Sequence, residues 1–200
     1  MFNNRTYRWL KRRDFILVMF LFAVALLILI FNLRSYFHVK QPDLTLLEDY
    51  KGCMDSLSEA VIPETETPGA TSAGVSAVVL KLVQHCLTLK EQNTFLNGMQ
   101  ELDKYCLGKY GNVFKRCSQT QQIERLYQLE NNANMGGRFV TKVRQKLFGK
   151  SFIHLVKELC VIGYCTSFKG ATEGLAYDGV PGSYQGCVLL NKNQHSWATT

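Results

Sequence analysis

The stretch RRDFILVMFLFAVALLILIFNLR, residues 12–34, contains an apolar run that no polar residue interrupts from Phe15 to Phe31. A helix over residues 15–33 would be about 28 Å long at about 1.5 Å per residue. That length nearly matches the roughly 30 Å hydrocarbon core of a bilayer. The alternative is a helix buried in a protein core. A helix that is apolar on every face must then be surrounded on all sides, and a chain of 200 residues is too short to do this easily. The run therefore predicts a transmembrane helix over residues 15–33, with the lipid bilayer as its partner.

The same run argues against removal as a signal peptide. Secretory signals have apolar cores of about 7–15 residues, followed by a small-x-small cleavage site. Here the core is 17 residues long, and the Ala-x-Ala motif at residues 23–25 lies in its middle. We therefore expect a retained signal-anchor.

Basic residues before the run predict its orientation. Because Lys and Arg flanks stay in the cytosol, residues 1–14 are predicted to be a cytosolic tail, with the C-terminus luminal or extracellular. The alternative is an inner mitochondrial membrane with the C-terminus in the intermembrane space. Most of the net charge of +7 lies in this flank, so no nucleic-acid partner is predicted. The residues of this topology signal are Arg5, Arg8, Lys11, Arg12 and Arg13.

The rest of the chain predicts a mainly α-helical ectodomain over residues 43–190, joined to the anchor by a juxtamembrane segment at 34–42. Leu47, Met54 and Leu57 belong to an apolar stripe at helical spacing. Residues 63–74 are rich in Pro, Gly and Thr, which predicts a flexible loop.

Two further helices are predicted after that loop. Residues 75–107 have helical spacing, with a break expected near Gln92. Residues 139–160 predict one helix, bent near Gly149, with Phe139 and Val143 facing inward. Its basic side resembles that of membrane-surface helices, although a solvated outer face is the favoured interpretation.

The C-terminal part has a different composition. Residues 169–187 contain five glycines, which excludes a long helix and predicts a loop-rich segment with a tight turn or short hairpin. The polar tail at 191–200 is expected to fray.

All seven cysteines follow the apolar run, which places them on the predicted oxidising side and favours disulfides that staple the helices. Seven is odd, so one thiol is left free or forms an intermolecular disulfide. Their spacing does not settle the pairing, although Cys106 and Cys117 could bridge a local turn. No metal site is predicted, because paired ligand spacings are missing. The disulfide candidates are Cys53, Cys86, Cys106, Cys117, Cys160, Cys165 and Cys187.

The sequence contains no hydrolase motif and no phosphate-binding loop, so no cofactor and no catalytic residue are predicted. We therefore favour a protein-binding, accessory or structural subunit of a membrane or surface assembly. An anchored luminal enzyme, a mitochondrial accessory subunit and a viral envelope protein of the same topology are the alternatives. Aromatic residues can anchor an interface with a protein partner, and the candidates are Tyr105, Tyr110, Phe114, Tyr177 and Tyr184.

Overall fold

The computed structural model describes the backbone of residues 4–36, 40–180, 182–183, 186–187, 189, 192 and 194–197. Within the helices, the side chains of residues 4–13, 31–36, 138, 140 and 147–148 are not described. The chain divides into two compact units, Met1–Lys40 and Gln41–Thr200. Each unit is considered by itself below.

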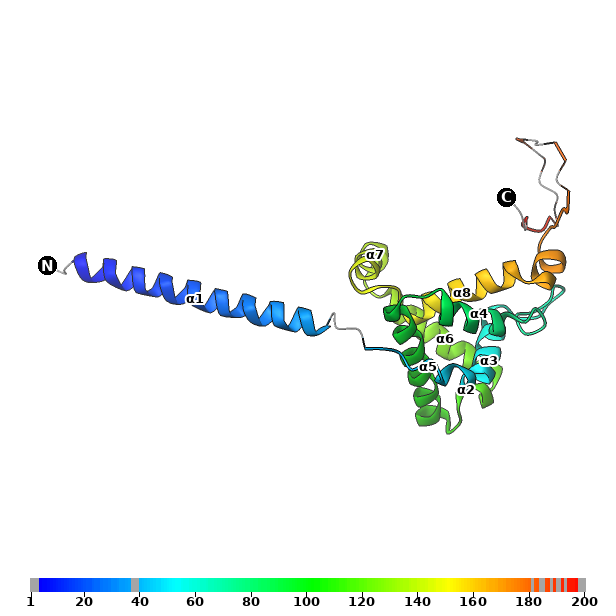
Figure 1. Ribbon diagram of the computed structural model, residues 1–200, viewed down its shortest axis with the longest axis horizontal. Coiled ribbons are helices and arrows are strands. Elements are labelled where there is room, and N and C mark those ends of the chain that lie inside the picture. Colours follow the sequence, from blue (N-terminus) through cyan, green and yellow to red (C-terminus); the bar gives the residue numbers. More distant parts are fainter. Residues whose placement is uncertain are drawn as a thin grey trace. The chain divides into compact units, whose positions relative to one another are not determined.

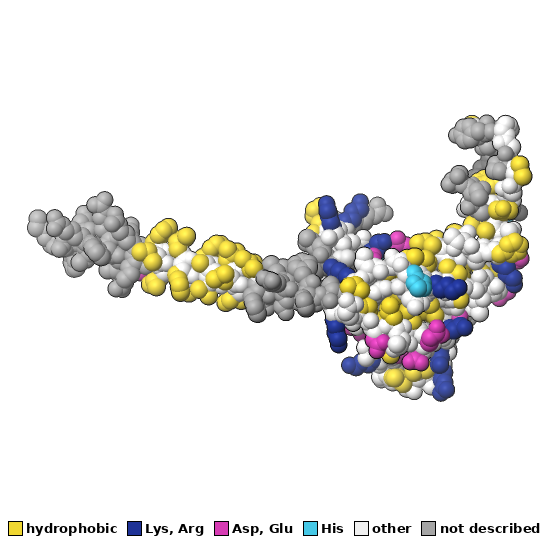
Figure 2. All heavy atoms as spheres, in the orientation of Figure 1, with side chains coloured by type: hydrophobic (Ala, Val, Ile, Leu, Met, Phe, Trp, Pro, Cys, Tyr) yellow, Lys and Arg dark blue, Asp and Glu magenta, His cyan; other side chains and the backbone are white. Residues whose placement is uncertain are grey.

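The first unit contains the helix α1 (Asn4–Tyr36). No Gly or Pro interrupts this sequence, so nothing in it opposes a continuous helix. Its large apolar side chains from Phe15 to Ile30 are mostly exposed, and they cover the visible face of the described part in Figure 2. Among the residues described, no helix is both long enough and apolar enough to cross a membrane. The basic side chains of the predicted topology signal lie outside the described side chains.

The second unit is helical, which confirms the predicted fold class (Figure 1). Its described residues form no strand, only a single bridge between Ala176 and Trp197. The predicted tight turn or hairpin near residues 176–184 falls partly outside the described residues. The elements are α2 (Leu46–Asp49), α3 (Lys51–Val61), α4 (Val75–His85), α5 (Leu89–Tyr110), the 3-10 turn η1 (Phe114–Arg116), α6 (Gln119–Asn134), α7 (Gly137–Phe148), α8 (Phe152–Thr166) and the π-turn η2 (Gly170–Gly174).

The helix α8 lies at the centre of this unit and packs against α3, α4, α5 and α6. Its apolar residues Leu155 and Val156 are almost completely buried, together with Met54 and Leu57 of the predicted stripe on α3. The helices α5 and α8 approach closely at Gly98, where a Cβ atom would overlap the ring of Phe152. The core of the second unit is therefore assembled around α8.

The break between α4 and α5, predicted near Gln92, comes earlier in the chain. Helix α4 ends at His85, and α5 begins at Leu89 behind a capping box in which Thr88 and Glu91 satisfy each other's backbone amides. Gln92, where the break was expected, is buried inside α5. Its side-chain amide donates to the carbonyl oxygens of Val83 at 2.9 Å and of Gln84 at 3.2 Å. A polar residue that suggested a break instead ties α5 to the end of α4.

The single helix predicted over residues 139–160 was wrong. Gly149 has φ of +90°, in a region that favours glycine, and it separates α7 from α8. Phe139 is 80% exposed and Val143 is 41% exposed, so neither faces inward as predicted. Figure 1 shows α7 set apart from the helices that surround α8.

Candidate functional site

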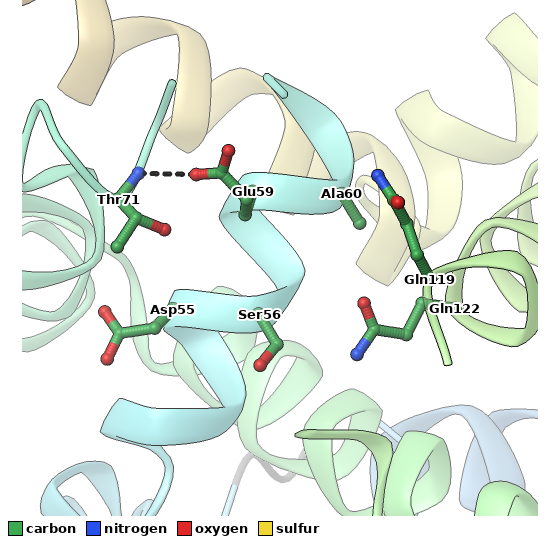
Figure 3. Close-up of a pocket in the computed structure, with 7 residues that line it drawn as sticks. All are labelled: Asp55, Ser56, Glu59, Ala60, Thr71, Gln119 and Gln122. Atoms are coloured by element: carbon green, nitrogen blue, oxygen red, sulfur yellow. Dashed lines mark hydrogen bonds between the residues drawn. The ribbon is translucent and has the colours of Figure 1, made fainter. Parts of the chain in front are cut away.

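A polar pocket of about 350 Å³ lies between α3, α6 and the loop at residues 63–74. Asp55 and Glu59 come from α3, and Gln119 and Gln122 come from α6. Figure 3 shows Glu59 and Thr71 turned toward each other on one side of α3, with the two glutamines on the other side.

The polar groups of this pocket are occupied by contacts within the chain. Glu59 accepts hydrogen bonds from the backbone amides of Glu64 at 2.9 Å and Thr71 at 2.8 Å. Burial alone would raise the pKa of Glu59, but these hydrogen bonds outweigh it and lower the pKa. Asp55 accepts a hydrogen bond from the Ser76 hydroxyl. Glu59 therefore fastens the loop to α3, and Asp55 ties α3 to Ser76 of α4.

The loop at residues 63–74 was predicted to be flexible, but hydrogen bonds hold it to the helices. Besides its two hydrogen bonds to Glu59, it receives a hydrogen bond at the Pro68 carbonyl from the hydroxyl of Tyr164 on α8, at 2.8 Å. Ala70 is completely buried. The loop is therefore tied to both α3 and α8 despite its composition.

Two of the predicted interface residues, Tyr105 and Tyr110, lie together near the end of α5. Their ring centroids are 6.5 Å apart at an interplanar angle of 74°. The Arg125 guanidinium of α6 stacks 3.7 Å from the centroid of Tyr105, and Lys109 pairs with Glu124 at 2.7 Å. This cluster of cations and aromatic rings holds α5 against α6. Its side chains already contact one another, so they are only partly available to a protein partner.

The other predicted interface residues are distributed differently. Phe114 is completely buried, so it belongs to the core and is not available to a partner. Tyr177 is 54% exposed. Tyr184 lies outside the described residues.

The predicted disulfide staples are not supported, because all seven cysteines are described and all are free thiols. Cys86 is the C-cap residue of α4 and is exposed. Its position follows from the earlier helix break, which turns the residue out of the core. The buried thiols are Cys53, Cys106, Cys117 and Cys160, and the exposed ones are Cys86, Cys165 and Cys187.

Three of the buried cysteines gather beside Asp103 of α5. Burial raises the pKa of Cys106 to about 12, with a further contribution from the neighbouring Cys117. Burial likewise raises the pKa of Cys53, whose thiol lies 3.9 Å from the Asp103 carboxylate. Thiols held in the protonated form are poor nucleophiles and poor metal ligands. In the part of the chain that the structure describes, no group of His, Cys, Asp or Glu is placed to hold a metal ion.

The carboxylates of the polar pocket and the aromatic cluster of α5 thus make contacts that hold elements of this unit together. Residues 48–182 match the family model described as gluconate 2-dehydrogenase subunit 3, and the chain belongs to that family. The matched region extends from α2 through α8 and leaves α1 outside. No curated protein matches the chain, and no solved structure matches it.

One surface was missed by the sequence interpretation, namely α7 with its outward apolar face. Two signals could have revealed it. Gly136 and Gly137 interrupt the chain directly before Arg138, and no Asp or Glu occurs between residues 131 and 157. Both features are unusual for a helix whose apolar face packs into a core.

Proposed function

We propose that this chain is a non-catalytic accessory subunit of a multi-subunit dehydrogenase that acts on gluconate or a related sugar acid. The observation that carries the proposal is the family match over residues 48–182, which covers the whole helical core. The carboxylates of the polar pocket support it, because Glu59 is engaged by the loop at residues 63–74 and Asp55 by Ser76 of α4. The dehydrogenase chemistry then belongs to a partner subunit.

The test is isolation of the tagged full-length chain from its native cells in mild detergent. We expect a larger subunit to be isolated with it in a fixed ratio, together with gluconate-dependent reduction of an artificial electron-accepting dye. The purified chain alone should have no such activity. A chain that stays monomeric in the native extract, or that oxidises gluconate by itself, would overturn the proposal.

We further infer that residues 15–33 hold the chain at a membrane, with residues 1–14 in the cytosol and the helical unit on the opposite side. The support is the uninterrupted apolar sequence and its basic flank. Exposed apolar side chains along α1, such as Phe15, Leu21 and Ile28, add to it. Protease added to sealed vesicles with the cytosolic side outward should leave residues 34–200 intact. Digestion of the helical unit in those vesicles would refute this orientation.

A further inference from the structure

The helix α7 turns its polar side toward the rest of the unit. Thr141, Lys142 and Gln145 line a cavity of about 540 Å³, together with Asn134 of α6 and His154 of α8. The Gln145 amide nitrogen lies 3.4 Å from His154 Nδ1, which also lies 2.8 Å from the Ser151 hydroxyl. Among its described side chains, α7 therefore contacts the body of the protein through polar groups that line a hollow.

The apolar side chains of α7 that the structure describes face away from the body. Phe139 and Val143 are four residues apart and so lie on one face of the helix. Phe139 is 80% exposed, Val143 is 41% exposed, and Met135, just before the helix, is 64% exposed. An amphipathic helix normally buries its apolar side. Here the described apolar side chains are exposed instead, which indicates a surface that a binding partner covers.

Basic side chains accompany this apolar face, and Figure 2 shows Lys and Arg beside hydrophobic side chains over α7. The described ion pairs of the chain use Lys109, Lys150 and Lys157, and none involves a basic residue of α7. The Arg144 guanidinium donates to the Met135 carbonyl at 3.3 Å. With no carboxylate in the sequence from residue 131 to 157, this cationic surface complements an acidic one. The basic residues of α7 with described side chains are Lys142, Arg144 and Lys146.

Glycines with positive φ separate α7 from both neighbouring helices. Gly136 has φ of +98° and Gly137 of +79° at its start, and Gly149 has +90° at its end. Side chains are strained in this backbone region, so glycine is required there. These joints allow α7 to leave the direction of α6 and α8 and to present its own apolar face.

We propose that α7 is a docking helix that seats Phe139 and Val143 in an apolar groove of a larger subunit, with Asp or Glu at the rim of the groove pairing with Lys146. The proposal rests on the proposed function, because it requires that larger subunit. A protein groove is favoured over a lipid surface because α7 lies inside the region that matches a subunit family, whereas the apolar run of α1 lies outside it. Helix-in-groove recognition uses such i, i+4 anchors.

The test uses the full-length chain, isolated from its native cells as above. Two variants change α7, namely the double variant Phe139→Ser with Val143→Ser and the single variant Lys146→Glu. The matched control variants are Phe168→Ser, at a side chain that is 81% exposed after α8, and Lys169→Glu beside it. We expect both α7 variants to lower the amount of co-isolated larger subunit at least tenfold, and both controls to leave it within twofold. Circular dichroism should show unchanged helix content in all four, because the altered side chains are not buried.

A photo-crosslinking benzoylphenylalanine in place of Phe139 identifies the occupant directly. We expect it to attach to a peptide of the co-isolated larger subunit that contains Asp or Glu. Attachment to phospholipid or only to a second copy of this chain would overturn the proposal, as would wild-type co-isolation by folded α7 variants. If the wild-type chain brings down no larger subunit, the proposed function itself fails. If it does so and the α7 variants do so equally, only the role of α7 fails.

Discussion

Helices α7 and α8 are consecutive in the chain and have similar apolar spacing, yet they occupy opposite environments. Leu155 and Val156 of α8 are at most 2% exposed, whereas Phe139 of α7 is 80% exposed. Helix α8 is surrounded by α3, α4, α5 and α6, while α7 packs chiefly against α6. Amphipathic spacing therefore predicts that a helix has an apolar face, but not what covers that face.

The difference has a physical origin in what lies opposite each helix. Gly98 of α5 and Gly163 of α8 have no side chains, so α8 can approach both α5 and α4 closely. A Cβ atom added at Gly98 would overlap Phe152 of α8, and one added at Gly163 would lie 3.2 Å from the side chain of Val75 of α4. Such close packing stabilises α8 within this chain. Helix α7 meets polar residues and a cavity on its inner side, and its apolar face is left for a partner.

The largest expected effect is on thiol reactivity within α8. Burial raises the pKa of Cys160 to about 12 from its ordinary 9.0, so at pH 8 its thiolate is about a thousandfold scarcer than that of an ordinary thiol. Cys165, at the exposed end of the same helix, should be alkylated rapidly. Mass spectrometry of timed alkylation measures both rates. Equal rates would show that α8 is not buried as described.

The same alkylation in denaturant without reductant counts the free thiols. Seven modified cysteines are expected from the structure. A lower count would restore the disulfide staples that the sequence predicted, and peptide mapping would then show whether Cys106 and Cys117 are paired.

Truncating the centre of α8 should cost the most stability. Leu155→Ala removes a side chain that is 2% exposed and should lower the free energy of unfolding by about 2–5 kcal/mol. Chemical denaturation of residues 41–200 measures it, since the core cluster lies entirely within that unit. A loss below about 0.5 kcal/mol would contradict the central position of α8.

Adding a methyl group where α5 meets α8 should have a smaller effect. Gly98→Ala places a Cβ against the Phe152 ring and should lower the free energy of unfolding by about 1–3 kcal/mol. Gly108→Ala is the matched control in the same helix, because nothing lies within 4 Å of its Cβ position. The control should be neutral or stabilising by up to about 1 kcal/mol, since Ala favours a helix over Gly. Similar losses for both variants would argue against the close approach.

The smallest expected effect is at the exposed face of α7. Phe139→Ala should change the free energy of unfolding of residues 41–200 by less than about 0.5 kcal/mol, because the side chain is already in water. Its matched comparison is Leu155→Ala under the same denaturation conditions. A loss of about 3 kcal/mol or more would mean that Phe139 is buried in the isolated unit.

The sequence predicted the helices well where a buried face was covered by other helices of the same chain. Leu47, Met54 and Leu57 were expected on one buried face of a helix and are buried together. Apolar spacing does not show the division between α2 and α3 at Tyr50, nor the capping box of Thr88 and Glu91 that begins α5.

The candidate site was harder to predict than the fold. Tyr105 and Tyr110 were expected to be interface residues and do lie together, but Phe114 is buried because η1 turns it inward. The apolar face of α7 was predicted to point inward, because apolar spacing shows that a helix has such a face but not what covers it. The prediction of disulfides assumed that cysteines on one side of a membrane would pair, whereas burial alone accounts for four of them in the structure.

Hydrogen–deuterium exchange of the amides in α7 and α8 tests the central claim most directly. It should be measured on residues 41–200 alone and on the full-length chain in its native complex. The account predicts that α8 is protected in both samples, and that α7 exchanges rapidly in the isolated unit but becomes at least tenfold slower in the complex. Unchanged exchange of α7 in a complex that contains the larger subunit would contradict its assignment as the docking helix.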